Sequence, residues 1–159
     1  MQRRHAFSLI ELSIAVFIIA IIIAVALPSF VRSYNQAVLN ETARTFATTC
    51  LLGRVQAVTQ QKPATLHIDL EHQMFWLTQT SGTGEEQTLK TYQIDKRVQL
   101  ASGELVDGSA KSGGKLAEIL FYPNGTCDSI TVVFRSGERG GVAATLDPIT
   151  CQANPYPVK

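Results

Sequence analysis

The sequence predicts an α+β fold in which a long N-terminal helix packs on an antiparallel β-sheet. Residues 7–27 are apolar except for two serines and one carboxylate. Residues 29–61 then continue with helical spacing of apolar and polar side chains. Beyond Pro63 the pattern changes to short alternating runs separated by Gly, Pro and Asn, which is typical of strands and turns.

The first apolar segment is long enough to cross a membrane. The 21 residues from Phe7 to Leu27 would form a helix of about 32 Å. Arg3 and Arg4 precede it, which predicts that residues 1–6 are cytoplasmic and the rest of the chain lies outside. A removable secretory signal is the alternative, but its apolar core spans only about 7 to 15 residues. We therefore expect a transmembrane helix over residues 7–28.

Residues 29–62 are expected to extend this helix as an amphipathic segment. Pro28 should kink the helix or mark its exit from the bilayer, and Lys62 with Pro63 should end it. We expect one apolar face to be packed, formed by Phe30, Tyr34, Ala37, Val38, Phe46, Ala47, Cys50, Leu51, Val55 and Val58.

Residues 63–159 are expected to form the antiparallel β-sheet domain. Alternation predicts a hairpin from residues 64–70 and 74–78, and further short strands at residues 89–94, 98–100 and 141–146. Residues 119–122 and 130–134 flank Pro123-Asn124-Gly125 and are expected to form a second hairpin. Two segments are expected to lack regular structure, namely a mobile loop at residues 101–115 and an irregular tail at residues 148–159.

Charge and motifs exclude several classes of function. Of the 14 basic and 13 acidic residues, 12 of each follow Pro28, so the exported part is nearly neutral and nucleic acid is not an expected partner. The sequence contains none of the common catalytic, metal or phosphate-loop spacings, so we expect no enzymatic activity, cofactor or metal. His67 and Asp69 share a strand face, with His72 at the turn. We interpret them as surface residues of a half-solvated strand rather than a metal site or catalytic dyad.

Glu11 is the most informative residue in the chain. It is the only charged residue between His5 and Arg32, and it lies near the start of the apolar segment. A carboxylate near the middle of a membrane costs about 2.5–3.5 kcal/mol, and less toward the interface. A nearby positive charge would offset this cost. The alternative is an ordinary anchor in which the carboxylate reaches the lipid headgroups.

The N-terminus resembles the class III signal of type IV pilins and type II secretion pseudopilins. The resemblance rests on residues 6–12, the apolar run and Pro28-Ser29-Phe30. It implies that a prepilin peptidase removes the leader, residues 1–6, between Ala6 and Phe7, and methylates the Phe7 amino group. Glu11, the fifth residue of the mature chain, would pair with the Phe7 ammonium of a neighbouring subunit. Ala6 departs from the usual glycine, but it is also small.

The remainder resembles the GspH/FimT-like branch, through residues 54–66, 121–125 and 146–150. This implies a pilin-like fold and a minor pseudopilin, a structural subunit of the periplasmic pseudopilus of a type II secretion system. A minor type IV pilin in adhesion, twitching motility or DNA uptake is the alternative. The implied partners are other pilin or pseudopilin subunits, the prepilin peptidase/N-methyltransferase, the inner-membrane assembly platform and membrane lipid. The protein would be a single-pass inner-membrane protein with a periplasmic domain until it joins a filament.

Three cysteines leave three disulfide pairings open from sequence alone: Cys50, Cys127 and Cys151. The resemblance to pilins, which often carry a C-terminal disulfide, implies a bond between Cys127 and Cys151, with unpaired thiols as the alternative. On its apolar helix face, Cys50 is expected to be a buried small hydrophobic residue.

Overall fold

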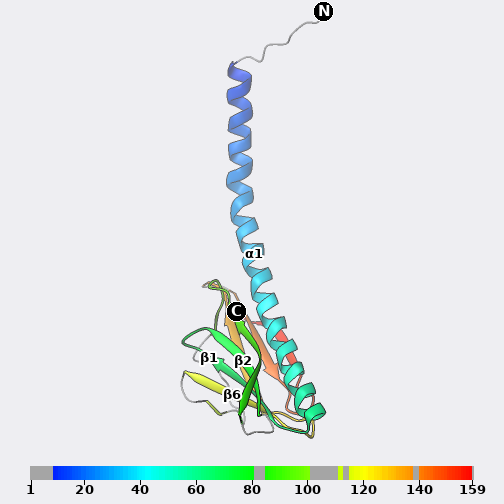
Figure 1. The fold of residues 1–159 in the computed structure, drawn as a ribbon. Helices are drawn as coiled ribbons and strands as arrows, with labels where there is room; N and C mark the ends of the chain where they lie inside the picture. Colours follow the sequence, from blue (N-terminus) through cyan, green and yellow to red (C-terminus); the bar gives the residue numbers. More distant parts are fainter. Residues whose placement is uncertain (1–8, 81–84, 101–110, 113–114, 138–139, 159) are drawn as a thin grey trace, which may run out of the picture. The chain divides into compact units, whose positions relative to one another are not determined.

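The computed structural model describes residues 9–80, 85–100, 111–112, 115–137 and 140–158 (Figure 1). The chain divides into two units, residues 1–35 and 36–159, which are described separately below. Helix α1 (Leu9–Gln60) contributes to both units. It continues through Pro28, as predicted, and ends two residues before the expected Lys62.

The second unit contains two antiparallel sheets where the sequence predicted one. The α+β prediction is confirmed, and each strand pair is antiparallel. The five-stranded sheet has the order β3 (Glu86–Gln93), β2 (Met74–Thr80), β1 (Ala64–Asp69), β6 (Leu116–Phe121) and β5 (Lys111–Ser112). The four-stranded sheet has the order β4 (Gln99–Leu100), β7 (Ile130–Arg135), β8 (Gly141–Leu146) and β9 (Ala153–Val158).

Both sheets share a core with the second-unit part of α1. The ring of Phe46 meets Phe75 of β2 edge-on at 5.8 Å and Phe134 of β7 at 5.7 Å, so one helical side chain touches both sheets. The buried helical positions recur every three or four residues, as expected for one helix face. They are the apolar or small residues Leu39, Ala43, Phe46, Cys50, Gly53 and Ala57, and the buried threonines Thr42 and Thr49 lie beside them.

The predicted packed face of the helix was partly wrong. Leu51, Val55 and Val58 expose 45%, 49% and 40% of their surfaces. In this part of the helix the small residues Gly53 and Ala57 face the sheets instead, because the backbones approach closely: a Cβ atom on Gly53 would lie 2.8 Å from the ring of Phe121. Periodicity alone favoured the larger aliphatic residues, but the close approach excludes them from this face.

The first predicted hairpin is confirmed by β1 and β2, whereas the second is wrong. The turn itself forms, since the Gly125 amide donates to the Tyr122 carbonyl at 2.9 Å and a bridge joins Phe121 to Cys127. However, β6 pairs with β1 and β5, and β7 pairs with β8 and β4. Both edges of β6 are therefore occupied, and β7 pairs in the other sheet.

The C-terminal tail was expected to be irregular, but residues 153–158 form β9 on the edge of the four-stranded sheet. Pro155 lies opposite Ala144, and Pro157 opposite Val142. Proline is tolerated on an edge strand when its nitrogen faces away from the neighbouring strand. Of the predicted loop at residues 101–115, residues 101–110 and 113–114 lie outside the described residues, and residues 111–112 form β5.

Candidate functional site

The N-terminal site is described in part. Glu11 lies in the first turn of α1, where the partial positive charge of a helix N-terminus favours a carboxylate. Nearby, the Ser13 hydroxyl donates to the Leu9 carbonyl at 2.9 Å. Ala6 and Phe7, the predicted cleavage and methylation residues, lie outside the described residues. The predicted roles of these two residues and of Glu11 therefore stay predictions.

Around Glu11, the first unit presents apolar side chains on every side of the helix. Leu9 and Phe17 expose 84% and 67% of their surfaces, and even Ile23 exposes 48%. A helix that is apolar all round is normally surrounded by protein or lipid. Within the part of the chain that the structure describes, no helix meets the combined length and apolarity expected of a membrane span.

The second unit also exposes aliphatic side chains on α1. We call Leu51, Val55 and Val58 the aliphatic ridge; their spacing places them on one helix face. Arg54, which lies between them in sequence, donates from Nη1 to the Thr150 carbonyl at 2.8 Å. This bond fixes the loop at residues 147–151 against the helix. Within that loop Ile149 exposes 73% of its surface.

An aspartate shapes the same loop from within. Asp147 Oδ1 accepts hydrogen bonds from the amides of Thr150 at 2.9 Å and Ile149 at 2.8 Å. These bonds favour the carboxylate and hold the pKa of Asp147 below its ordinary value. The loop is therefore ordered by local polar contacts, although its apolar tip is exposed.

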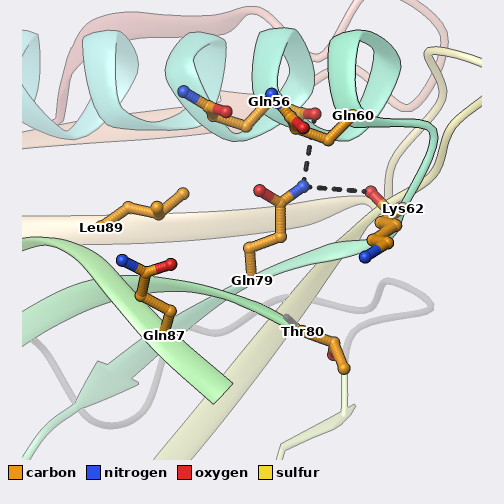
Figure 2. Close-up of a pocket in the computed structure, with 7 residues that line it drawn as sticks. All are labelled: Gln56, Gln60, Lys62, Gln79, Thr80, Gln87 and Leu89. Atoms are coloured by element: carbon orange, nitrogen blue, oxygen red, sulfur yellow. Dashed lines mark hydrogen bonds between the residues drawn. The ribbon is translucent and has the colours of Figure 1, made fainter. Parts of the chain in front are cut away.

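A polar pocket of about 300 Å³ lies between the C-terminal end of α1 and strands β2 and β3 (Figure 2). The Gln79 amide donates to the carbonyls of Gln56 at 3.3 Å and Lys62 at 3.4 Å, so one side chain joins the strand to the helix end. Sequence reasoning missed this pocket because its residues come from three elements and form no local motif. It is lined by Gln56, Gln60, Lys62, Gln79, Thr80, Gln87 and Leu89.

Cys50, Cys127 and Cys151 are buried free thiols in this structure. The predicted burial of Cys50 is confirmed, with 0% of its surface exposed. The Cys127 thiol reaches the Asp147 carbonyl at 3.5 Å, and the Cys151 thiol reaches the Gly125 carbonyl at 3.5 Å. The two segments are thus side by side, and the Cys127–Cys151 disulfide stays a prediction.

His67 and Asp69 take part in separate interactions. His67 Nε2 lies 3.0 Å from Thr78 Oγ1, its Nδ1 lies 3.3 Å from Glu118 Oε1, and its ring stacks on Trp76 at 5.0 Å. Thr78, His67 and Glu118 are connected in the order of a catalytic nucleophile, base and acid, but Thr78 is only 4% exposed. His67 itself is only 9% exposed, so the prediction that it is a surface residue was wrong. We interpret this group as a structural network on the sheet.

Asp69 contacts the turn instead, where its Oδ2 lies 2.7 Å from His72 Nδ1. Its Oδ1 also accepts the amide of His72 at 2.9 Å. The backbone and side-chain bonds from His72 hold the pKa of Asp69 low, and the Asp69 carboxylate raises the pKa of His72. His67 and Asp69 therefore form no dyad with each other, because each is satisfied by a different neighbour.

Comparisons with known proteins support the sequence resemblance. Residues 1–27 match the family model of the prokaryotic N-terminal methylation motif. No curated protein sequence matches the chain.

Two groups of solved structures share the fold. The minor pseudopilin EpsH from the type 2 secretion system of Vibrio cholerae superposes with a TM-score of 0.56 at 12% identity, over 76% of this chain and 95% of that one. The type IV minor pilin FimU of Pseudomonas aeruginosa gives 0.52 at 13% identity, over 76% and 88%. The predicted pilin-like fold is confirmed: the chain combines the N-terminal methylation motif with the fold of minor pseudopilins and minor pilins.

Proposed function

We propose that the chain is a minor pseudopilin of a type II secretion system. The observation that carries the proposal is the combination of an N-terminal methylation motif with a pseudopilin fold in one chain. The EpsH structure superposes slightly better than the FimU structure, with TM-scores of 0.56 and 0.52, and for this reason we place secretion before a pilus. A minor type IV pilin is the second candidate, supported by the FimU fold.

The proposed work of the protein is assembly rather than catalysis. Processing between Ala6 and Phe7 by a prepilin peptidase would leave a methylated ammonium four residues before Glu11. Before assembly, residues 7–28 would anchor the protein in the inner membrane, with the second unit in the periplasm. After assembly, the apolar surface of Leu9–Ile23 would be covered by the helices of neighbouring subunits.

Glu11 would select the register between neighbouring helices. A carboxylate in apolar surroundings is costly without a partner, and the Phe7 ammonium of another subunit can supply one. Only an alignment that brings the two charges together satisfies both groups. A buried polar group fixes register in coiled coils for the same reason.

Replacing Glu11 tests this role. Glu11→Ala should leave leader removal and N-methylation intact, as shown by mass spectrometry of the mature chain, and should abolish incorporation into the filament. Ser13→Ala is the matched control, because it changes a polar residue of the same apolar helix without removing the charge. Normal incorporation of Glu11→Ala would refute the pairing.

Deleting the gene for this chain distinguishes a type II secretion system from a type IV pilus. Loss of the chain should reduce release of secreted enzymes while surface pili and twitching remain normal. The reverse result would support the minor pilin and overturn the secretion assignment. Complementation with the wild-type chain and with Glu11→Ala would show whether the phenotype depends on assembly.

A further inference from the structure

The polar pocket between α1, β2 and β3 is lined mainly by neutral polar side chains (Figure 2). Its lining contains four glutamines and one threonine, together with one lysine and one leucine. Gln56 and Gln60 are four residues apart and share a face of the helix, while Gln79 of β2 lies opposite Gln87 of β3. Side chains from the helix and from the strands therefore border one volume of about 300 Å³.

Three of the four glutamine amides in this pocket are not used by the fold. Gln79 Nε2 donates to the carbonyls of Gln56 and Lys62, so the Gln79 side chain has a structural role. In contrast, the side-chain amides of Gln56, Gln60 and Gln87 have no hydrogen-bond partner among the residues that the structure describes. Each amide has a carbonyl oxygen that accepts and an amino group that donates. Three pairs of acceptor and donor groups can therefore bind a ligand.

The charges around the pocket favour a neutral ligand. Among the described residues of the lining, Lys62 is the one that carries a charge, and it disfavours a cation. The pocket also lies at the C-terminal end of α1, where the partial negative charge of the last carbonyls disfavours an anion. Glu86 directly precedes Gln87, so strand alternation places it on the opposite face of the sheet. An apolar ligand is also unfavourable, because it would remove the three amides from water without giving them partners.

We infer that this pocket binds an uncharged sugar ring. Each hydroxyl group of a sugar both donates and accepts, so adjacent hydroxyls match the acceptor and donor of a glutamine amide. Leu89 supplies an apolar contact for the C–H groups of the ring. The volume of about 300 Å³ is at the lower end of the range for ligand pockets, which suits a mono- or disaccharide rather than a larger ligand.

A peptide is the other neutral ligand that is rich in donors and acceptors, but this arrangement suits it less well. The hydrogen-bonding groups of an extended chain point alternately to its two sides, so a peptide needs a row of partners along a strand edge. Here the glutamines come from both the helix and the strands and border a compact volume. The site therefore fits a ring better than an extended chain. Sugar binding here would be independent of the type of filament in which the chain assembles.

Titration of the full chain with neutral sugars tests the site. The isotope-labelled protein is held in micelles of a detergent that has no sugar headgroup, and glucose, galactose, mannose and N-acetylglucosamine are added separately. At least one sugar should give saturable shifts of the side-chain amide resonances of Gln56, Gln60 and Gln87 in two-dimensional NMR spectra. A dipeptide with blocked ends, acetyl-alanyl-alanine amide, is titrated in parallel and should give no such shifts.

Substitutions in the lining identify the binding residues. Gln60→Ala and Gln87→Ala change exposed side chains, so the fold should be retained. Each should weaken sugar binding about fivefold for every hydrogen bond that is lost. Gln87→Glu keeps the size of the side chain but removes its donor, and it should also weaken binding. Thr88→Ala is the matched control, because Thr88 is an exposed residue on the other face of β3, and it should bind sugar as the wild type does.

Three results would overturn the inference. The first is the absence of saturable shifts with all four sugars. The second is a set of shifts that the blocked dipeptide causes and the sugars do not, which would show a peptide site. The third is sugar binding that Gln60→Ala and Gln87→Ala leave unchanged, or that Thr88→Ala weakens equally, since either result would place the sugar elsewhere on the protein.

Discussion

Replacing Gly53 with alanine should change the stability of the fold in two opposing ways. Gly53 lies within α1, where alanine is favoured over glycine by about 1 kcal/mol. Opposing this, the new Cβ atom would lie 2.8 Å from two ring carbons of Phe121 and 3.1 Å from Leu77 Cδ1. Phe121 and Leu77 are both 0% exposed, so neither side chain can move into solvent.

The packing term should dominate. Adding a methyl group to a filled core costs about 1–3 kcal/mol, which exceeds the gain in helix propensity. The net expectation for Gly53→Ala is a loss of about 1 kcal/mol in the free energy of unfolding. For a unit of this size, that corresponds to a decrease of about 4 °C in the melting temperature.

Thermal unfolding followed by near-ultraviolet circular dichroism measures this change. Thr59→Ala is the matched control, because residue 59 is an exposed position of the same helix, where alanine should be neutral or slightly stabilising. Combining Gly53→Ala with Phe121→Leu should cost less than the sum of the single changes, since the smaller side chain relieves the contact. An unchanged or raised melting temperature for Gly53→Ala would refute the close-approach argument.

Two further predictions concern the core and the β1–β2 turn. Phe46→Ala should lower the free energy of unfolding by about 3–5 kcal/mol, because Phe46 contacts both Phe75 and Phe134; denaturant titration against the milder Phe46→Leu checks this. The Asp69–His72 pair should stabilise the fold between the unfolded pKa values of Asp and His, about 4 and 6.5. The stability that Asp69 contributes is lost as the pH falls through the lowered pKa of Asp69. The stability that His72 contributes is lost as the pH rises through the raised pKa of His72. An NMR titration of His72 should give a midpoint above 6.5 that Asp69→Asn lowers; equal midpoints would contradict the pairing.

Local sequence patterns predicted the elements whose pairing is also local. The alternation before and after residues 70–73 was sufficient for β1 and β2, which are adjacent in both sequence and space. The Pro123-Asn124-Gly125 turn was equally clear, but the partner of β7 is decided by which strand edges remain free. That information is distributed over the whole sheet. The three prolines after residue 147 likewise concealed β9, whose edge position makes Pro155 and Pro157 acceptable.

The candidate sites also divide into those that a local motif indicates and those that only the fold brings together. Glu11 could be selected as a candidate from the sequence because it lies within consecutive residues, 1–27, that match the N-terminal methylation motif. The contact of Arg54 with the Thr150 carbonyl could not be predicted, because it depends on how α1 packs against the loop at residues 147–151. The glutamine-lined pocket is also assembled from separate elements and has no sequence signature.

Helix α1 exposes apolar side chains in both units, but their arrangement around the helix differs. In the first unit, large side chains such as Leu9 and Phe17 are exposed around the helix. In the second, one face that includes Phe46 is buried in the core, and the aliphatic ridge is exposed. Folding of a single chain therefore leaves apolar surface uncovered on both parts of the helix. Contiguous exposed apolar surface marks contact with a partner or a lipid phase. Such contact would provide affinity without direction, since apolar packing is not directional. Glu11 is the charged residue within the apolar run, so in the proposed assembly it would be the group that specifies the alignment of neighbouring helices.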